Sequence, residues 1–203
     1  MTIDDTAGNG RTSKEQSQFG ADRTPVRSAA QGPLVDRLRA GEPYALAFGG
    51  QGAPWLSALA ELTRDSGLEP TLTELVNEAA AMLEPVAQDL LVVRPVGFDP
   101  IAWILEQELA DDETAPAGPS EAALTSAAVS LPGVFLTQLA ALRALQQQGL
   151  DPAVNAPVAT IGHSQGLIAA AAVAGGGAAD GALLATAQLI GAAAGLDGRC
   201  GSP

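Results

Sequence analysis

The stretch "GHSQG" at positions 162–166 places a serine between two glycines, directly after the apolar run 157–161 and ahead of the alanine-rich run 167–174. A Gly-x-Ser-x-Gly pattern between a strand and a helix predicts a nucleophile elbow, whose strained turn lifts the serine hydroxyl out of the fold. Gly162 and Gly166 are required because side chains at these positions would collide with their neighbours. The pattern therefore indicates nucleophilic attack by Ser164 on a carbonyl carbon.

Such an attack also needs hydrogen-bond donors for the negative oxygen that forms on the substrate carbonyl. The helix after the turn begins with free N–H groups, among them that of Gln165. A second loop, "GGQG" at 49–52, follows the apolar run 44–48, and its glycines permit N–H groups to turn toward a ligand. We therefore expect the backbone N–H groups of Gln51 and Gln165 to form an oxyanion site, where one donor is worth roughly 3–4 kcal/mol. The supporting glycines of this loop are Gly49, Gly50 and Gly52.

A serine nucleophile further needs a base within about 3 Å to take its proton. His163 is the only histidine of the sequence. Neighbouring side chains in such a turn point apart, so we expect His163 to pack and hydrogen-bond beneath the turn and to support the elbow. The sequence thus supplies a nucleophile and donors, but no histidine placed to act as base.

The elements that must position these motifs alternate short apolar runs with long helical patterns, which is an α/β arrangement. Buried parallel strands are predicted over 44–48 and 157–161. Pro85 is expected to kink or end the third predicted helix. The predicted helices cover 33–41, 56–67, 70–83, 99–110, 120–130, 131–149, 167–174 and 178–195.

Composition divides the chain into three parts. Residues 1–33 are polar and poor in large apolar side chains, which predicts a disordered leader. Residues 34–196 contain the predicted core, and 197–203 read as a tail. The single cysteine, Cys200, lies near the end of the chain, so no internal disulfide is expected.

Charge and hydropathy exclude several classes of partner. The formal net charge of −13 argues against binding of nucleic acid or of an anionic membrane surface. The apolar stretch 166–196 is interrupted at 175–177 and at Asp180, so it predicts two buried helices rather than a membrane span. No signal peptide and no metal site are predicted, and a cytoplasmic location is expected.

Three segments, "FGGQG" at 48–52, "SLPGVFLTQLAALRALQQQGLDP" at 130–152 and "GHSQG" at 162–166, carry a resemblance to a known family. They resemble the acyltransferases of fatty acid and polyketide synthesis, which move acyl groups from coenzyme A to acyl carrier protein. Within this family they are most similar to the acetyltransferase domain near the start of the type I fatty acid synthase of actinobacteria and fungi. The resemblance covers residues 44–195.

The resemblance implies a ping-pong reaction with no bound cofactor. Ser164 would take the acyl group of an acyl-CoA substrate, acetyl-CoA in the closest case, and the phosphopantetheine thiol of acyl carrier protein would collect it. Acyl carrier protein and other fatty acid synthase domains are the implied partners. Gln138 matches a glutamine that the family keeps near its site, although a role on the helix surface is equally compatible with its position.

The sequence also departs from this family. The family places a ferredoxin-like subdomain and a histidine base after the elbow helix, and neither is found here. The expected fold is therefore an incomplete α/β-hydrolase-like acyltransferase core, a parallel sheet flanked by helices with the ferredoxin-like subdomain missing. We expect such a fragment to have little turnover alone. Asp180 and Asp197 are expected to be surface or cap residues, since no histidine remains for them to orient.

Two other functions fit parts of the pattern. An α/β-hydrolase, either an esterase or a thioesterase, shares the elbow but normally carries an "HGGG"-like loop where this sequence has "GGQG". A non-catalytic docking module would leave Ser164 inert. The identity of the acyl group is not encoded in these motifs.

Overall fold

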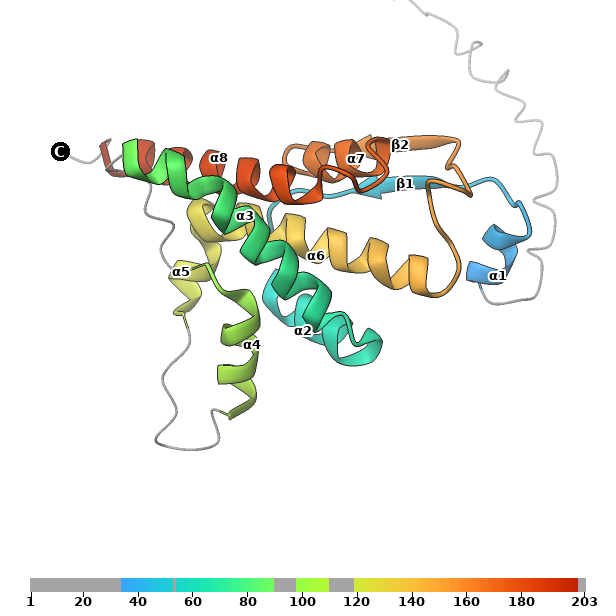
Figure 1. Cartoon of the computed structure of the whole chain (residues 1–203), viewed down its shortest axis with the longest axis horizontal. Coiled ribbons are helices and arrows are strands. Elements are labelled where there is room, and N and C mark those ends of the chain that lie inside the picture. The colour runs from blue at the N-terminus through green and yellow to red at the C-terminus, as the bar shows by residue number, and fades with distance from the viewer. Residues whose placement is uncertain (1–33, 53, 90–97, 110–118, 201–203) are drawn as a thin grey trace, which may run out of the picture. The chain divides into compact units, whose positions relative to one another are not determined.

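The computed structural model describes residues 34–52, 54–89, 98–109 and 119–200 (Figure 1). The predicted leader over 1–33 lies outside these residues. In chain order the elements are α1 (Leu34–Arg39), β1 (Ala45–Phe48), α2 (Trp55–Ser66), α3 (Glu69–Asp89), α4 (Pro100–Leu109), α5 (Glu121–Thr125), α6 (Ala127–Gln147), β2 (Ala159–Gly162), α7 (Gly166–Ala174) and α8 (Asp180–Cys200).

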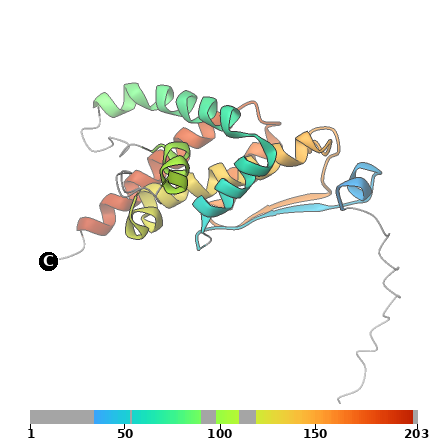
Figure 2. The same ribbon diagram turned by 90° about the horizontal axis from the view of Figure 1, so that it is seen from below.

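The two strands pair in parallel, and their register brings both sequence motifs to one edge. Ala45 lies opposite Ala159, and Phe48 lies opposite Gly162. The N–H of His163 donates to the carbonyl of Phe48 at 3.0 Å, which extends the pairing by one residue. Both loops therefore leave the sheet together (Figure 2). The fold is mostly helical with a small parallel sheet, which confirms the predicted incomplete α/β class.

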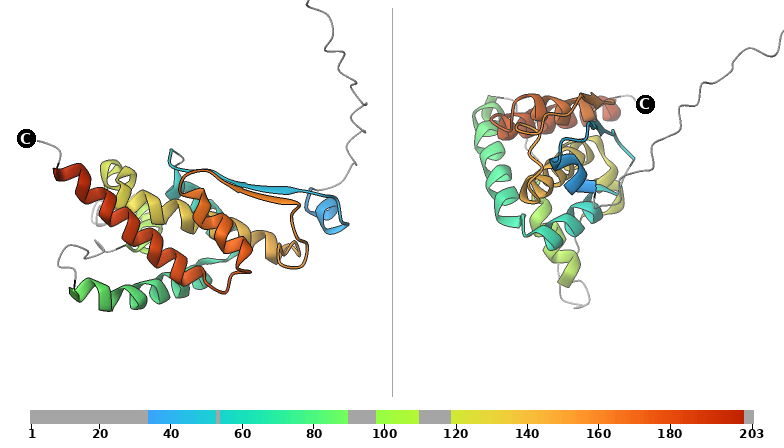
Figure 3. Two further views of the ribbon diagram at one scale, coloured as in Figure 1. Left: turned by 90° about the horizontal axis from the view of Figure 1, so that it is seen from above. Right: turned by 90° about the vertical axis from the view of Figure 1, so that its right-hand side faces the viewer.

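The prediction that both strands are buried is wrong. One face of each strand packs on the core through Leu46 and Phe48, whereas Ile161 on the other face is 60% exposed. Helices α2–α8 all lie on one side of the sheet (Figures 2 and 3), and α7 packs against both strands. The exposed face was not predicted because most of its residues are alanine, which is found on exposed faces as well as on buried ones. The exposed strand residues are Ala45, Ala47, Ala159 and Ile161.

Helix α6 forms the centre of the core, where α2 and α8 pack against it. Phe135, Leu136 and Leu139 on this helix are almost completely buried. The predicted break at 130–131 is wrong, because Pro132 lies inside α6 and the chain turns instead at the extended Ser126. Pro132 is the sixth residue of α6, so its ring nitrogen removes one internal hydrogen bond, the one to the carbonyl of Ala128, and the helix continues past this loss.

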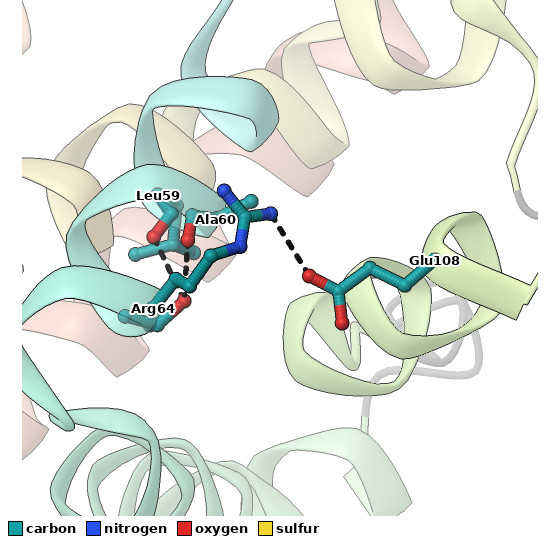
Figure 4. Close-up of polar contacts among 5 residues, drawn as sticks. Leu59, Ala60, Arg64 and Glu108 are labelled. Carbon is teal, nitrogen blue, oxygen red and sulfur yellow. Dashed lines mark hydrogen bonds and ion pairs between the residues drawn. The ribbon is translucent and has the colours of Figure 1, made fainter.

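Helix α2 runs from Trp55 to Ser66 and is capped by Gly67, whose φ of 64° gives the left-handed conformation that glycine favours. The ring of Trp55 packs edge-on against Trp103 of α4. Farther along α2, Arg64 pairs with Glu108 of α4 at 2.9 Å, and Figure 4 shows the two side chains pointing toward one another. These contacts hold α4 against α2.

Two helices extend beyond their predicted ends. Helix α3 continues past Pro85 to Asp89 rather than stopping at the proline. Helix α8 continues to Cys200, so residues 197–200 are helical and not the predicted tail. Once a helix is nucleated, each internal glycine destabilises it by only about 1 kcal/mol. The glycines near the end of α8 therefore do not stop the helix.

Within the described part of the chain, α6 is the one helix long and apolar enough to cross a membrane. This differs from the stretch 166–196 that the sequence brought into question. Other parts of the protein bury 56% of its most apolar window, and core helices of globular proteins pass the same test. Helices α2 and α8 pack against α6, so its apolar side chains contribute to the core.

Candidate active site

Ser164 occupies a strained turn between β2 and α7. Its φ of 54° makes it the one non-glycine residue with a positive φ in the described part of the chain. A left-handed conformation costs a residue with a side chain roughly 1–2 kcal/mol. The turn is closed by hydrogen bonds from Gly166 N–H to the His163 carbonyl at 2.9 Å and from Leu167 N–H to the Ser164 carbonyl at 3.1 Å. The serine side chain is exposed, so its hydroxyl can reach a ligand.

The two flanking glycines have a steric reason. A Cβ atom on Gly162 would lie 2.6 Å from the backbone carbon of Gly166 and from the Cα of Leu167. A Cβ on Gly166 would overlap the carbonyl group of Phe48. Backbone fills both positions, and the turn therefore brings β1, β2 and the start of α7 into direct contact.

The GGQG loop lies against this turn. A Cβ placed on Gly50 would be 3.2 Å from the Cβ of Ser164 and 3.3 Å from the His163 carbonyl oxygen. Gly52 has a φ of 119°, a conformation that residues with side chains rarely adopt. The two motifs that lie more than a hundred residues apart in the sequence thus meet at one place.

The two residues proposed as oxyanion donors lie within the two motifs, Gln51 in GGQG and Gln165 in GHSQG. Gln51 is exposed, whereas the side chain of Gln165 is buried at 7% exposure. Among the described residues, no hydrogen bond occupies the backbone N–H of Gln51 or of Gln165. Both groups are therefore free to donate to a ligand, and their assignment as oxyanion donors stays a prediction.

His163 lies in a different place from the one expected. Its side chain is exposed rather than packed beneath the turn, and its Nδ1 lies close to Gly50. The backbone of Gly162 packs directly against that of Gly166 and Leu167, so main chain fills this side of the turn. In the described part of the chain, no hydrogen bond joins this imidazole to the Ser164 hydroxyl.

Two polar side chains of α6 hold the GGQG loop. Gln138 donates from Nε2 to the Gly49 carbonyl at 2.8 Å, which places this glutamine at the site and not on a free helix surface. Gln51 donates from Nε2 to the Oγ of Ser130 at 2.9 Å. Sequence reasoning missed Ser130, although a serine within the apolar run 127–136 is the signal that could have drawn attention to it.

Comparison with known proteins adds to this geometry. The model of the SAT family, described as starter unit:ACP transacylase in aflatoxin biosynthesis, matches residues 46–191. The chain belongs to this transacylase family. The match includes three of the four residues of β1, all of β2, the GGQG loop and the elbow.

A curated relative supports the same family assignment. The chain is 31% identical over 138 residues to the highly reducing polyketide synthase fogA of Aspergillus ruber. The alignment covers 68% of this chain and 5% of that synthase. The resemblance to the acyltransferases is thereby confirmed, whereas the narrower resemblance to a fatty acid synthase stays a prediction.

Away from the elbow, the chain contains a second polar cluster. Asp180 is 4% exposed and pairs with Arg143 of α6 at 2.5 Å, so the surface part of the expected surface or cap role is wrong. Its place as the first residue of α8 is compatible with the cap part of that expectation. Burial raises the pKa of Asp180, and the nearby Arg143 opposes that rise. The pair joins α6 to α8, with Asp180 buried and Arg143 partly exposed.

Proposed function

We propose that this protein transfers an acyl group from acyl-CoA to acyl carrier protein through an ester on Ser164. The supporting observation is the exposed Ser164 in its strained turn, in contact with the loop that carries Gln51. The Ser164 oxygen attacks the thioester carbonyl carbon, the carbon–sulfur bond breaks, and coenzyme A leaves as its thiol. The phosphopantetheine sulfur then attacks the ester, and the serine hydroxyl is regenerated.

The N–H groups of Gln51 and Gln165 stabilise the oxyanion of both tetrahedral intermediates in this proposal. Both N–H groups are unoccupied, and donors fixed before the reaction lower the barrier most. The proton of Ser164 needs an acceptor, and the single histidine of these 203 residues is His163, whose side chain makes no hydrogen bond to the serine hydroxyl among the described residues. We therefore expect the base to come from outside this sequence and the isolated chain to react slowly.

The acyl donor is proposed to be acetyl-CoA, and the acceptor to be an acyl carrier protein of the same synthase. The matched family concerns starter units, and the relative is a polyketide synthase, which favours a role in loading a polyketide starter. Service in a fatty acid synthase would use the same chemistry on the same serine. Other synthase domains are the proposed neighbours in either case.

The proposal is tested by incubating the purified chain with acetyl-CoA and measuring its intact mass over time. We expect the slow addition of one acetyl group, located on Ser164 by peptide mapping. Ser164→Ala should remove the addition, whereas Ser57→Ala, which changes another exposed serine, should retain it. Acetylation that persists in Ser164→Ala would contradict the proposal. Release of free acetate without acetyl-enzyme would instead indicate a hydrolase.

A further inference from the structure

Resting on the proposed function, we infer that Ser130 is a positioning residue for the oxyanion site. Its hydroxyl binds the side chain of Gln51 and thereby fixes the direction of the Gln51 backbone N–H. Ser130 itself is not proposed to touch the substrate. Its effect passes through one hydrogen bond to the residue that does.

The first step of the argument is the surroundings of the Ser130 hydroxyl. Ser130 is 6% exposed, and Val129 and Val134 next to it on α6 are also buried. A hydroxyl in such surroundings is costly unless it is hydrogen-bonded. Serines inside helices commonly bond to a carbonyl of their own helix. Here the bond runs instead to Gln51, 79 residues away, at 2.9 Å.

The second step is that α6 holds the loop at two points. Gln138 lies about two turns farther along the helix and binds the carbonyl of Gly49 at 2.8 Å. The Gly50 backbone lies between the two held residues and against Ser164. A segment with three glycines has little conformational preference of its own. The two hydrogen bonds therefore restrict the peptide planes from Gly49 to Gln51, on the same side of the site as Ser164.

The third step separates positioning from stability. The Gln51 side chain is exposed, so water can replace the hydroxyl of Ser130 as its partner at small cost to folding. An oxyanion donor acts only when its direction is fixed before the reaction. Displacement of a catalytic group by about 1 Å can slow a reaction roughly a hundredfold. The loss of this hydrogen bond should therefore change the rate much more than the stability.

The experiment measures single acetylation of Ser164 in the full chain by acetyl-CoA, followed by intact mass. Ser130→Ala and Gln51→Ala should each slow acetylation at least about tenfold, and the double variant should be no slower than the slower single variant. Ser130→Thr keeps the hydroxyl and should restore most of the rate. Thr63→Val removes a buried hydroxyl that bonds only within α2, so it serves as the matched control and should keep the wild-type rate.

A second readout does not depend on the chemistry of Ser164. Amide hydrogen exchange of the loop 49–52 should be faster in Ser130→Ala, unchanged in Thr63→Val and close to wild type in Ser130→Thr. If the wild-type chain is not acetylated at all, the proposed function fails, and loop exchange alone decides whether Ser130 holds the loop. A wild-type acetylation rate in Ser130→Ala, or unchanged loop exchange in that variant, would overturn the inference.

Discussion

Gly166 packs directly against the carbonyl group of Phe48. A Cβ on Gly166 would lie 2.7 Å from the carbonyl carbon of Phe48 and closer still to its oxygen. The end of β1 and the first residue of α7 are therefore in backbone contact, although 117 residues follow Phe48 before Gly166 is reached. This contact fixes the position of the serine turn relative to the GGQG loop.

We expect Gly166→Ala to destabilise the fold by at least about 1–3 kcal/mol, because a methyl group must displace the Phe48 carbonyl. Urea unfolding followed by circular dichroism measures the change. Gly175→Ala is the matched control, since its Cβ would lie 3.4 Å from the nearest atom at an ordinary φ of −82°. Equal unfolding midpoints for the two variants would contradict the steric account.

We expect Ser164→Gly to be more stable than Ser164→Ala by about 1 kcal/mol, because only glycine adopts a φ of 54° without steric cost. Both variants lack the hydroxyl, so their comparison isolates the backbone strain. The same exchange should have the opposite sign in a helix. On the exposed side of α3, Ala80→Gly should lower the free energy of unfolding by about 1 kcal/mol. A Ser164→Gly variant less stable than Ser164→Ala would argue against the strained turn.

We expect Gly52→Val to slow acetylation of Ser164 strongly, because its φ of 119° excludes a β-branched side chain and the loop must rearrange. Gly41→Val provides a control at a φ of 93°, before β1 and at the opposite end of that strand from the site. Gly41→Val should lose stability while keeping the acetylation rate. An unchanged acetylation rate in Gly52→Val would show that the GGQG loop takes no part in the reaction.

Stability at different pH values should reveal the buried Asp180. Burial raises its pKa above the ordinary value of 3.8, Arg143 partly opposes the rise, and Glu78 adds to it. The folded protein therefore holds this proton more tightly than the unfolded chain. The contribution of Asp180 to stability is fully present below pH 3.8 and is lost as the pH rises through the raised pKa. The stability of wild type relative to Asp180→Asn should fall with increasing pH in that window.

Asp151 should show the opposite slope in the same urea titrations. The Ala153 N–H and the Gln146 side chain hydrogen-bond its carboxylate and lower its pKa from 3.8. Its contribution is therefore present above pH 3.8 and is lost as the pH falls through the lowered pKa. The stability of wild type relative to Asp151→Asn should rise with pH. Slopes of the same sign for both variants would contradict the assigned causes.

The parts of the site that follow from local backbone geometry could be predicted from the sequence. The two glycines around Ser164 predict the tight turn, because the Gly-x-Ser-x-Gly spacing between a strand and a helix is typical of a nucleophile elbow. Each motif follows the end of a predicted strand, and the two strands are predicted to be parallel. The GGQG and GHSQG loops are therefore expected at the same edge of the sheet. The register of Phe48 with Gly162 agrees with that prediction.

The parts that depend on distant partners could not be predicted. The hydrogen bond from Gln51 to Ser130 and the ion pair of Asp180 with Arg143 join segments whose proximity no local pattern encodes. The exposed face of the strands was missed because alanine occurs equally in buried and exposed positions. The break at Ser126 was missed because serine marks a helix end less strongly than glycine or proline does.

Trp55, Phe98 and Trp103 pack against one another, and the two tryptophans provide an intrinsic fluorescence signal. The sequence contains two tryptophans, Trp55 and Trp103, and their ring centroids are 6.4 Å apart. Trp55 starts α2 just after the GGQG loop, and its ring covers Gly133 on α6. Intrinsic fluorescence would thus be dominated by one small region beside the GGQG loop, so quenching or a shift in emission could follow ligand entry without any added dye.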